Sequence, residues 1–197
     1  MSTIINASTT SGLVQTADTS GTLELQSNGT TQLTVSSTGS YGHIKSGTAQ
    51  ASTSGTAIDF TSIPSWVKRI TVMFSGVSTS GTSNLLVQVG NSGGVISSGY
   101  ACSVASSGSS SEVDSTAGFI MTYVNAAAST QTGVLELVNL EAGSWLGTGQ
   151  ALQGATTFVW NFVGSVNSVG TLDRIRITTV NGTDTFDAGS INILYEG

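Results

Sequence analysis

The hydrophobic positions of this chain recur with a period of two along most of its length. In the segment 173–180, for example, Ile175 and Ile177 alternate with two arginines, and clusters of Gly, Ser and Asn separate comparable segments. A period of two places alternate side chains on the two faces of a β-strand. The best stretch for a helix, residues 125–130, is too short and too rich in Ser and Thr to hold one alone. The pattern therefore predicts an all-β chain.

The part of the chain after residue 56 is predicted to contain a series of strands. Their predicted bounds are 56–60, 66–75, 84–90, 99–105, 118–125, 133–140, 156–163, 173–180 and 190–195, with a further short strand near 145–152. Short strands separated by turns in this way are typical of an antiparallel β-sandwich, including the jelly roll. No segment between them is long enough for the helical crossover that joins parallel neighbours.

The alternation also assigns the faces of these strands. In the segment 66–75, the face predicted to lie in the core carries Trp66, Lys68, Ile70, Val72 and Phe74. In the segment 156–163, both faces carry large apolar side chains. Such a strand is expected to be covered on both sides, as at a subunit interface.

The N-terminal part contains a hairpin signal in the sequence TLELQSNGTTQLTV. An Asn-Gly pair between two alternating runs is the strongest local signal for a β-hairpin, because both residues accept positive φ. An isolated two-stranded hairpin is marginally stable in water, and burying each large apolar side chain contributes roughly 1.5–3 kcal/mol. The hairpin therefore needs a partner, and we predict an assembly contact formed by Leu23, Leu25, Leu33 and Val35.

Residues 37–56 are rich in Ser, Thr and Gly and are interpreted as a linker or neck. The chain is accordingly predicted to divide into two parts. The first is an N-terminal module, residues 1–46, and the second is an antiparallel β-sandwich domain, residues 47–197.

Charge narrows the classes of function. Charged residues make up only 8% of the chain, against about 25% in ordinary soluble domains. The formal net charge is −6, so binding to nucleic acid or to an anionic membrane surface is not expected. No apolar run approaches the roughly 18 residues of a transmembrane helix, and the first residues lack the basic and apolar regions of a signal peptide. A location outside cells is therefore expected to follow from lysis.

Candidates for catalytic chemistry are few. Cys102 is the only cysteine and lies in an alternating segment, so we expect a buried small side chain rather than a reactive thiol. His43 is the only histidine, and no Gly-x-Ser-x-Gly motif accompanies it. One histidine without a pair of thiolates does not make a zinc site. No metal or cofactor is expected, and the chain is predicted not to be an enzyme.

Pairs of carboxylates are what a glycosidase needs on the two sides of the bond that it cleaves. The candidate pairs are Glu112 with Asp114, Glu136 with Glu141, and Asp184 with Asp187. The first pair lies in a Ser-rich segment that is interpreted as a flexible loop. The chain also lacks a long parallel β-helix, so depolymerase activity is not expected.

The sequence NGTDTFDAG around Asp184 and Asp187 permits two interpretations. The two carboxylates and Asn181 offer oxygen ligands for Ca²⁺, although their spacing does not match an EF-hand loop. A β-turn on Asn181 and Gly182, with aspartates that bond their own backbone, is the simpler interpretation and is favoured.

Three aromatic residues are candidates for contact with a glycan: Trp145, Tyr100 and Tyr123. Exposed aromatic rings combine an apolar body with a polar edge, as a sugar-binding face requires. Trp145 lies in the Gly-rich sequence EAGSWLGTG, interpreted as a loop, and is therefore expected to be the most exposed of the three. Structural packing is the favoured alternative for each.

Three stretches of the chain resemble segments of tailed-bacteriophage fibre and appendage proteins. They are GTLELQSNGTTQLTV, IDFTSIPSWVKRITVMFSGVSTSGTSNLLVQVG and RITTVNGTDTFDAGSINILYEG. The first is similar to a fibre-proximal hairpin module, and the other two are similar to a C-terminal β-sandwich found on virion surfaces. The resemblance implies a homotrimeric β-rich appendage of the virion, with an N-terminal module that docks on the particle.

The function expected from this resemblance is that of a non-enzymatic structural protein, either a short fibre or appendage or a head decoration protein. The alternative is a receptor-binding fibre tip that contacts a host glycan. Expected partners are further copies of the chain, other virion proteins through the N-terminal module and, in the alternative, a host surface glycan. The expected location is the virion.

Overall fold

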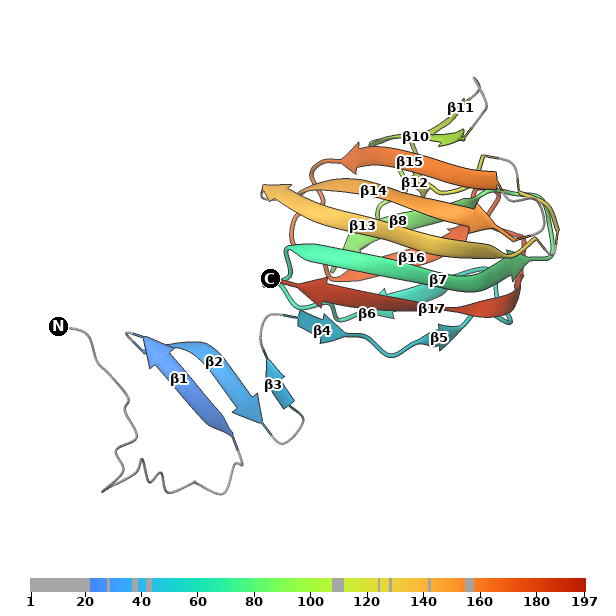
Figure 1. The fold of residues 1–197 in the computed structure, drawn as a ribbon. Coiled ribbons are helices and arrows are strands. Elements are labelled where there is room, and N and C mark those ends of the chain that lie inside the picture. Colours follow the sequence, from blue (N-terminus) through green and yellow to red (C-terminus); the bar gives the residue numbers. More distant parts are fainter. Residues whose placement is uncertain are drawn as a thin grey trace. The chain divides into compact units, whose positions relative to one another are not determined.

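The computed structural model describes residues 22–27, 29–36, 39–41, 44–107, 112–123, 125–127, 129–141, 143–154 and 158–197. The chain divides into two compact units, Met1–Gly42 and His43–Gly197, each with its own β-sheets (Figure 1). Every regular element in the described part is a β-strand, which confirms the predicted all-β class. Within that part, no helix of the length and apolarity needed to span a membrane occurs.

The division between the units falls at Gly42, whereas the sequence places it after residue 46. The reason is that β4 (Ile44–Ser46) pairs antiparallel with β17 (Phe186–Glu196), so that Ile44 faces Glu196. Residues 44–46 are therefore an edge strand of the second unit.

The first unit contains a three-stranded antiparallel sheet. Its strands are β1 (Leu23–Ser27), β2 (Thr30–Ser36) and β3 (Gly39–Tyr41), in that order. Gly29, between β1 and β2, has a φ of +74°, which glycine adopts without the steric penalty of a side chain. Leu23 faces Val35 across the pair, and the two residues are 42% and 36% exposed. These two side chains form an apolar stripe on β1 and β2 that the other described residues do not cover.

The second unit is a sandwich of two antiparallel sheets (Figure 1). Its remaining strands are β5 (Gln50–Ala51), β6 (Ile58–Thr61), β7 (Arg69–Thr79), β8 (Leu85–Asn91), β9 (Gly94–Val95), β10 (Tyr100–Ser106), β11 (Glu112–Ser115), β12 (Phe119–Ile120), β13 (Gln131–Glu141), β14 (Ser144–Gln153), β15 (Phe158–Val166) and β16 (Arg174–Thr179). The larger sheet has the order β11-β10-β15-β14-β13-β7-β17-β4, with β5 also paired to β17. The smaller sheet has the order β12-β8-β16-β6, with β9 paired to β8. This arrangement confirms the predicted antiparallel β-sandwich.

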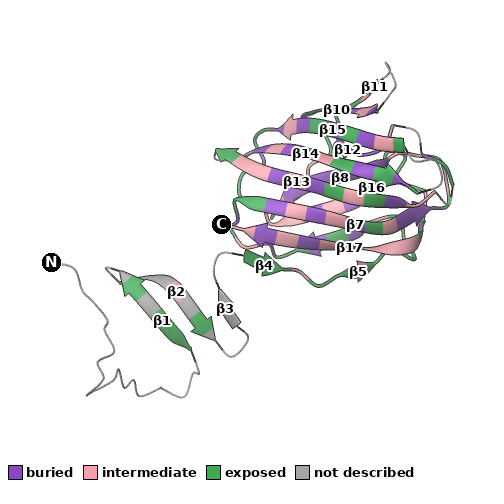
Figure 2. Ribbon diagram, in the orientation of Figure 1, coloured by how far each residue is buried: buried purple, intermediate pink, exposed green. Residues whose placement is uncertain are grey.

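The core lies between the two sheets, and buried residues alternate with more exposed ones along most of the longer strands (Figure 2), whereas β8 is buried at six successive residues. Ile70, Val72 and Phe74 of β7 are buried, as are Ile175 and Ile177 of β16. The alternation of the sequence therefore predicts the inward face of both strands correctly.

Close approach of the two sheets depends on a glycine of β14. A Cβ atom at Gly147 would lie 2.7 Å from the ring of Phe119, which β12 contributes from the smaller sheet. Phe119 also meets the ring of Tyr100 edge-on, with ring centroids 5.2 Å apart. A larger residue at position 147 would therefore push an aromatic ring out of the core.

The strand predicted at residues 66–75 begins later in the structure. β7 starts at Arg69 because the residues before it form a turn, in which the Val67 N–H donates to the carbonyl of Pro64 (3.1 Å). Val67 is consequently buried, whereas Trp66 and Lys68 are exposed. The prediction that Trp66 and Lys68 lie in the core is wrong.

The interpretation of the Ser-rich segment around Glu112 as a flexible loop is also wrong for residues 112–115. These residues form β11, an edge strand of the larger sheet in which Val113 faces Val104 of β10. Only one apolar residue in β11 follows the period of two, so the sequence contains too little alternation to reveal the strand.

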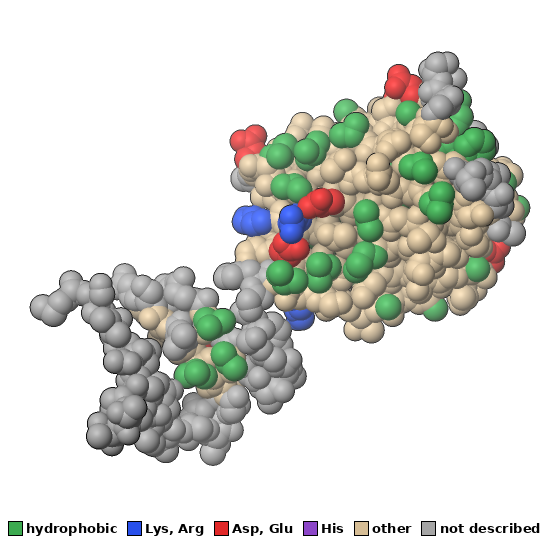
Figure 3. Space-filling model, viewed as in Figure 1, with side chains coloured by type: hydrophobic (Ala, Val, Ile, Leu, Met, Phe, Trp, Pro, Cys, Tyr) green, Lys and Arg blue, Asp and Glu red, His purple; other side chains and the backbone are tan. Residues whose placement is uncertain are grey.

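The outer face of the larger sheet carries apolar side chains that the rest of the described chain leaves partly open. Val134, Leu152 and Val163 are exposed, and hydrophobic side chains are scattered among polar ones over this face (Figure 3). β15 buries Trp160 and Phe162 on its inner face. Coverage of its outer face by another subunit stays a prediction.

Candidate functional site

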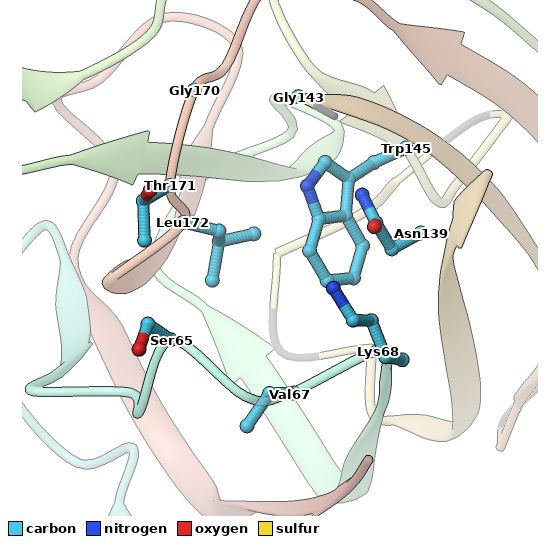
Figure 4. A pocket seen from close by; sticks show the side chains of 9 residues that line it. All are labelled: Ser65, Val67, Lys68, Asn139, Gly143, Trp145, Gly170, Thr171 and Leu172. Carbon is cyan, nitrogen blue, oxygen red and sulfur yellow. The ribbon is translucent and has the colours of Figure 1, made fainter. Parts of the chain in front are cut away.

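A cavity of about 320 Å³ opens at one end of the sandwich, a volume at the lower limit of the ~300–1,000 Å³ usual for ligand sites. Three segments that are far apart in the sequence form its walls: the turn before β7, the hairpin that joins β13 to β14, and the loop before β16. The residues that line it are Ser65, Val67, Lys68, Asn139, Gly143, Trp145, Gly170, Thr171 and Leu172 (Figure 4).

Backbone hydrogen bonds hold the first two walls together. The Lys68 N–H donates to the carbonyl of Glu196 (2.7 Å), and the Lys68 carbonyl accepts from the Asn139 N–H (2.8 Å). The side-chain amide of Asn139 donates to the carbonyls of Glu141 (2.9 Å) and Ser144 (3.1 Å), which fixes the hairpin. These hydrogen bonds therefore fix the positions of Lys68 and of the hairpin relative to the end of β17.

Glycine joins the hairpin to the third wall. Gly143 has a φ of +80°, and a Cβ atom there would lie 2.8 Å from the nitrogen of Gly170. The Gly143 carbonyl accepts a hydrogen bond from the Val169 N–H (2.8 Å), and the side-chain amide of Asn91 donates to the Val169 carbonyl (2.7 Å). Both the positive φ and the close approach favour glycine at position 143.

The cavity has a buried apolar floor and an exposed polar rim. Val67, Trp145 and Leu172 are buried, whereas Lys68 and Thr171 are exposed. Figure 4 shows the indole edge that carries the nitrogen of Trp145 facing Thr171 and Leu172, and the Lys68 side chain extending toward Trp145. None of the described residues that line the cavity is acidic.

The indole nitrogen of Trp145 is the unusual group in this cavity. Trp145 is only 3% exposed, and its Nε1–H has no hydrogen-bond partner. A buried donor without an acceptor costs about 1–3 kcal/mol, so most buried donors in folded proteins are paired. An acceptor bound in the cavity could offset this cost.

The structure changes the account of the three predicted glycan-contact residues. The expectation that Trp145 is exposed is wrong, because it lies in strand β14 with its ring in the core. Tyr100 is buried as well, and its hydroxyl donates to the carbonyl of Ile96 (3.0 Å) and accepts from the Val89 N–H (2.9 Å). Neither ring offers an open face on which a sugar can stack.

Tyr123 is the most open of the three but lies apart from the cavity lining. It is partly exposed, and its ring packs against Trp160 with centroids 5.9 Å apart. The Nε1–H of Trp160 is also buried without a partner. The three predicted aromatics therefore do not form one site: Trp145 lines the cavity described above, whereas Tyr100 lines a different pocket of about 570 Å³.

The predicted carboxylate pairs have separate structural partners. Glu136 forms an ion pair with Arg69 (3.2 Å). Glu112 and Asp114 lie on β11, where the Ser103 hydroxyl is 3.4 Å from Glu112. Glu141 ends β13 and faces Ser144.

Asp184 and Asp187 also have different partners. Asp184 accepts from the Ser83 N–H (2.9 Å) and from the side-chain amide of Asn181 (2.7 Å), whereas Asp187 accepts from the hydroxyl of Ser78. The Gly182 N–H donates to the carbonyl of Thr179 (3.0 Å), which closes a β-turn, but the two aspartates accept from Ser83, Asn181 and Ser78 rather than from their own backbone. No group of three His, Cys, Asp or Glu side chains suited to a metal ion occurs in the described part of the chain.

Cys102 is buried, as the sequence predicts, and burial raises the pKa of its thiol to about 11. A thiol that stays protonated at neutral pH is a weak nucleophile. His43 and the side chain of Leu25 lie outside the described residues.

Sequence reasoning missed most of the cavity. Lys68 is assigned to the core, and Asn139, Thr171 and Leu172 carry no motif. The one available signal is Trp145, whose proximity to several glycines indicates backbone that other groups approach closely. Comparison of the chain with models of protein families, with curated proteins and with solved structures finds no match.

Proposed function

We propose that this chain is a non-enzymatic structural protein of a bacteriophage virion, a short fibre, appendage or head decoration protein. It docks on the particle through its N-terminal module and displays the β-sandwich outward. It is made in the host cytoplasm and released by lysis. The assignment to a phage virion rests on the resemblance of the three stretches, and the observation that supports assembly is the uncovered apolar stripe on β1 and β2.

The apolar stripe favours a partner because the sheet that carries it is too small to cover exposed apolar side chains by itself. Leu23 and Val35 face each other and stay exposed, and among the described residues of the first unit the three short strands supply no second layer to cover them. Burial of each such side chain contributes roughly 1.5–3 kcal/mol. Other copies of the chain supply the facing surface in a homotrimer, the assembly implied by the resemblance to phage appendages.

The assembly is tested by the mass of the intact chain in solution. Native mass spectrometry is expected to give three times the mass of one chain. The double variant Leu23→Ser with Val35→Ser is expected to give monomers, because it removes the apolar contact. The matched control is Val180→Ser, an exposed valine in the turn after β16 of the second unit, which should leave the mass unchanged. A monomeric natural chain, or a trimeric double variant, contradicts the proposal.

A second candidate function is recognition of a host glycan, and the cavity at Trp145 favours it. The cavity joins an unpaired N–H donor, hydroxyl groups and an apolar floor, the combination that ligand sites commonly present. A displayed sandwich with such a site would serve as scaffold and as receptor binder together.

The second candidate is tested on a glycan array with the intact chain and Trp145→Phe. This variant keeps an aromatic ring in the core but removes the N–H, so binding is expected to fall about tenfold, ~1.4 kcal/mol. Trp66→Phe is the matched control, since Trp66 is exposed and absent from the cavity lining. Unchanged binding by Trp145→Phe removes the cavity from the argument.

A further inference from the structure

We infer that the cavity at Trp145 recognises an acidic saccharide, with the carboxylate of the sugar held by Lys68 and an acceptor oxygen bound to the indole N–H of Trp145. This inference rests on the second proposed function, glycan recognition, and names the class of glycan. It follows from the charge of the cavity, from its unpaired donor and from its size and rim.

The charge of the residues that line the cavity favours an anionic ligand. The chain has a formal net charge of −6, yet the only charged side chain among the described residues that line the cavity is the cation of Lys68. The other basic side chains are engaged: all three arginines form ion pairs, and Lys45 lies 6.0 Å from the ring centroid of Tyr195. Lys68 has no such contact with any described residue. A carboxylate bound at the rim would supply its missing partner.

The unpaired indole donor selects an oxygen-bearing ligand. Nε1 of Trp145 has almost no exposed surface of its own, and Leu172 lies across from it in Figure 4. An acceptor therefore reaches this nitrogen when the rim segment 170–172 shifts. This shift has to move Leu172, which is 4% exposed, whereas Gly170 and Thr171 before it are exposed. The new hydrogen bond then offsets the free energy lost by burying the donor unpaired.

The volume of the cavity and the hydroxyl groups at its rim favour a sugar over a simple carboxylic acid. A volume of about 320 Å³ suits one small ring. The hydroxyls of Ser65 and Thr171 can each donate and accept, which matches the hydroxyl groups of a sugar ring. Val67 and Leu172 offer apolar contact to its C–H groups.

The test follows the indole N–H signals of the intact chain by ¹H–¹⁵N NMR during titration. The chain has three tryptophans, and single Trp→Phe variants assign their signals. The probes are glucuronate, glucose and acetate. Glucuronate is expected to shift the signal of Trp145 and to bind about tenfold more tightly than glucose, a difference of ~1.4 kcal/mol. Acetate is expected to produce no saturable shift.

The variant Lys68→Gln isolates the charge. It should abolish the preference for glucuronate over glucose, while the backbone amide spectrum confirms that the fold is intact. Lys45→Gln, which removes the other exposed lysine, is the matched control and should keep the preference.

The possible outcomes separate this inference from the function on which it rests. Equal binding of glucose and glucuronate at Trp145 overturns the acidic class but leaves glycan recognition standing. Binding of acetate as tight as that of glucuronate overturns the saccharide and leaves only a carboxylate site. No shift of the Trp145 signal with any probe overturns the inference, and an array without binders would overturn glycan recognition itself.

Discussion

Phe119→Ala is expected to lower the free energy of unfolding by about 3–5 kcal/mol, the usual loss when a buried aromatic ring is truncated to a methyl group. Phe119 is fully buried between the two sheets. Its ring meets Tyr100 edge-on and fills the space above Gly147. Because glycine has no side chain to move into the vacated volume, the cavity left by the substitution cannot collapse easily. The loss should therefore lie at the upper end of the range.

Phe158→Ala is the matched control for this prediction. It removes the same atoms from β15, but Phe158 is 47% exposed, so the loss should stay below about 1 kcal/mol. Chemical denaturation followed by tryptophan fluorescence measures both variants at one chain concentration. Equal losses for the two variants would contradict the packing of Phe119 between the sheets.

Alternation predicts the sheets well because most of the longer strands of the sandwich have one buried face, although β8 is buried on both faces. Ile175 and Ile177 illustrate this point: their period of two is visible in the sequence, and both side chains are fully buried. The same rule fails just before β7. There the turn closed by Pro64 resets the period, so that Val67 is buried and Lys68 is exposed. Alternation carries no information about where a turn ends.

Trp145 shows a different limit of structure prediction from the sequence. The Gly-rich sequence around it suggests a loop, but the segment forms β14. Its glycines replace side chains on the inner face: Cβ atoms at Gly147 and Gly149 would each lie 2.7 Å from an aromatic ring, of Phe119 and Phe162 respectively. Glycine in this segment therefore marks close packing of the core rather than a flexible connection.

The cavity could not be predicted from the sequence for a topological reason. Lys68, Asn139 and Leu172 lie in three segments that are far apart in the sequence, and they meet only because β13 pairs with β7 and the loop before β16 bonds to Gly143. Strand order and register create the site. Neither is fixed by the local alternation of any one strand.

Alkaline pH is expected to destabilise the fold strongly between about pH 9 and pH 12. Burial is the main cause of two raised pKa values: the pKa of Cys102 rises from 9.0 to about 11, and the pKa of Tyr100 rises from 10.0 to about 12. In this range the unfolded chain loses the two protons while the folded chain still holds them. The free energy of unfolding therefore falls as pH rises. Each group contributes roughly 2–3 kcal/mol, on the order of 5 kcal/mol together by pH 12.

Two variants separate the contributions of Cys102 and Tyr100 to this fall in the free energy of unfolding, which is measured at each pH. Cys102→Ala should flatten the curve between pH 9 and 11, and Tyr100→Phe should flatten it between pH 10 and 12. Tyr100→Phe also lowers stability at neutral pH, because the hydroxyl that accepts from the Val89 N–H is lost, so the slope rather than the absolute value is compared. Tyr123→Phe, at a partly exposed tyrosine, is the control and should keep the full decline. A decline that persists in the Cys102→Ala and Tyr100→Phe double variant would show that other groups cause it.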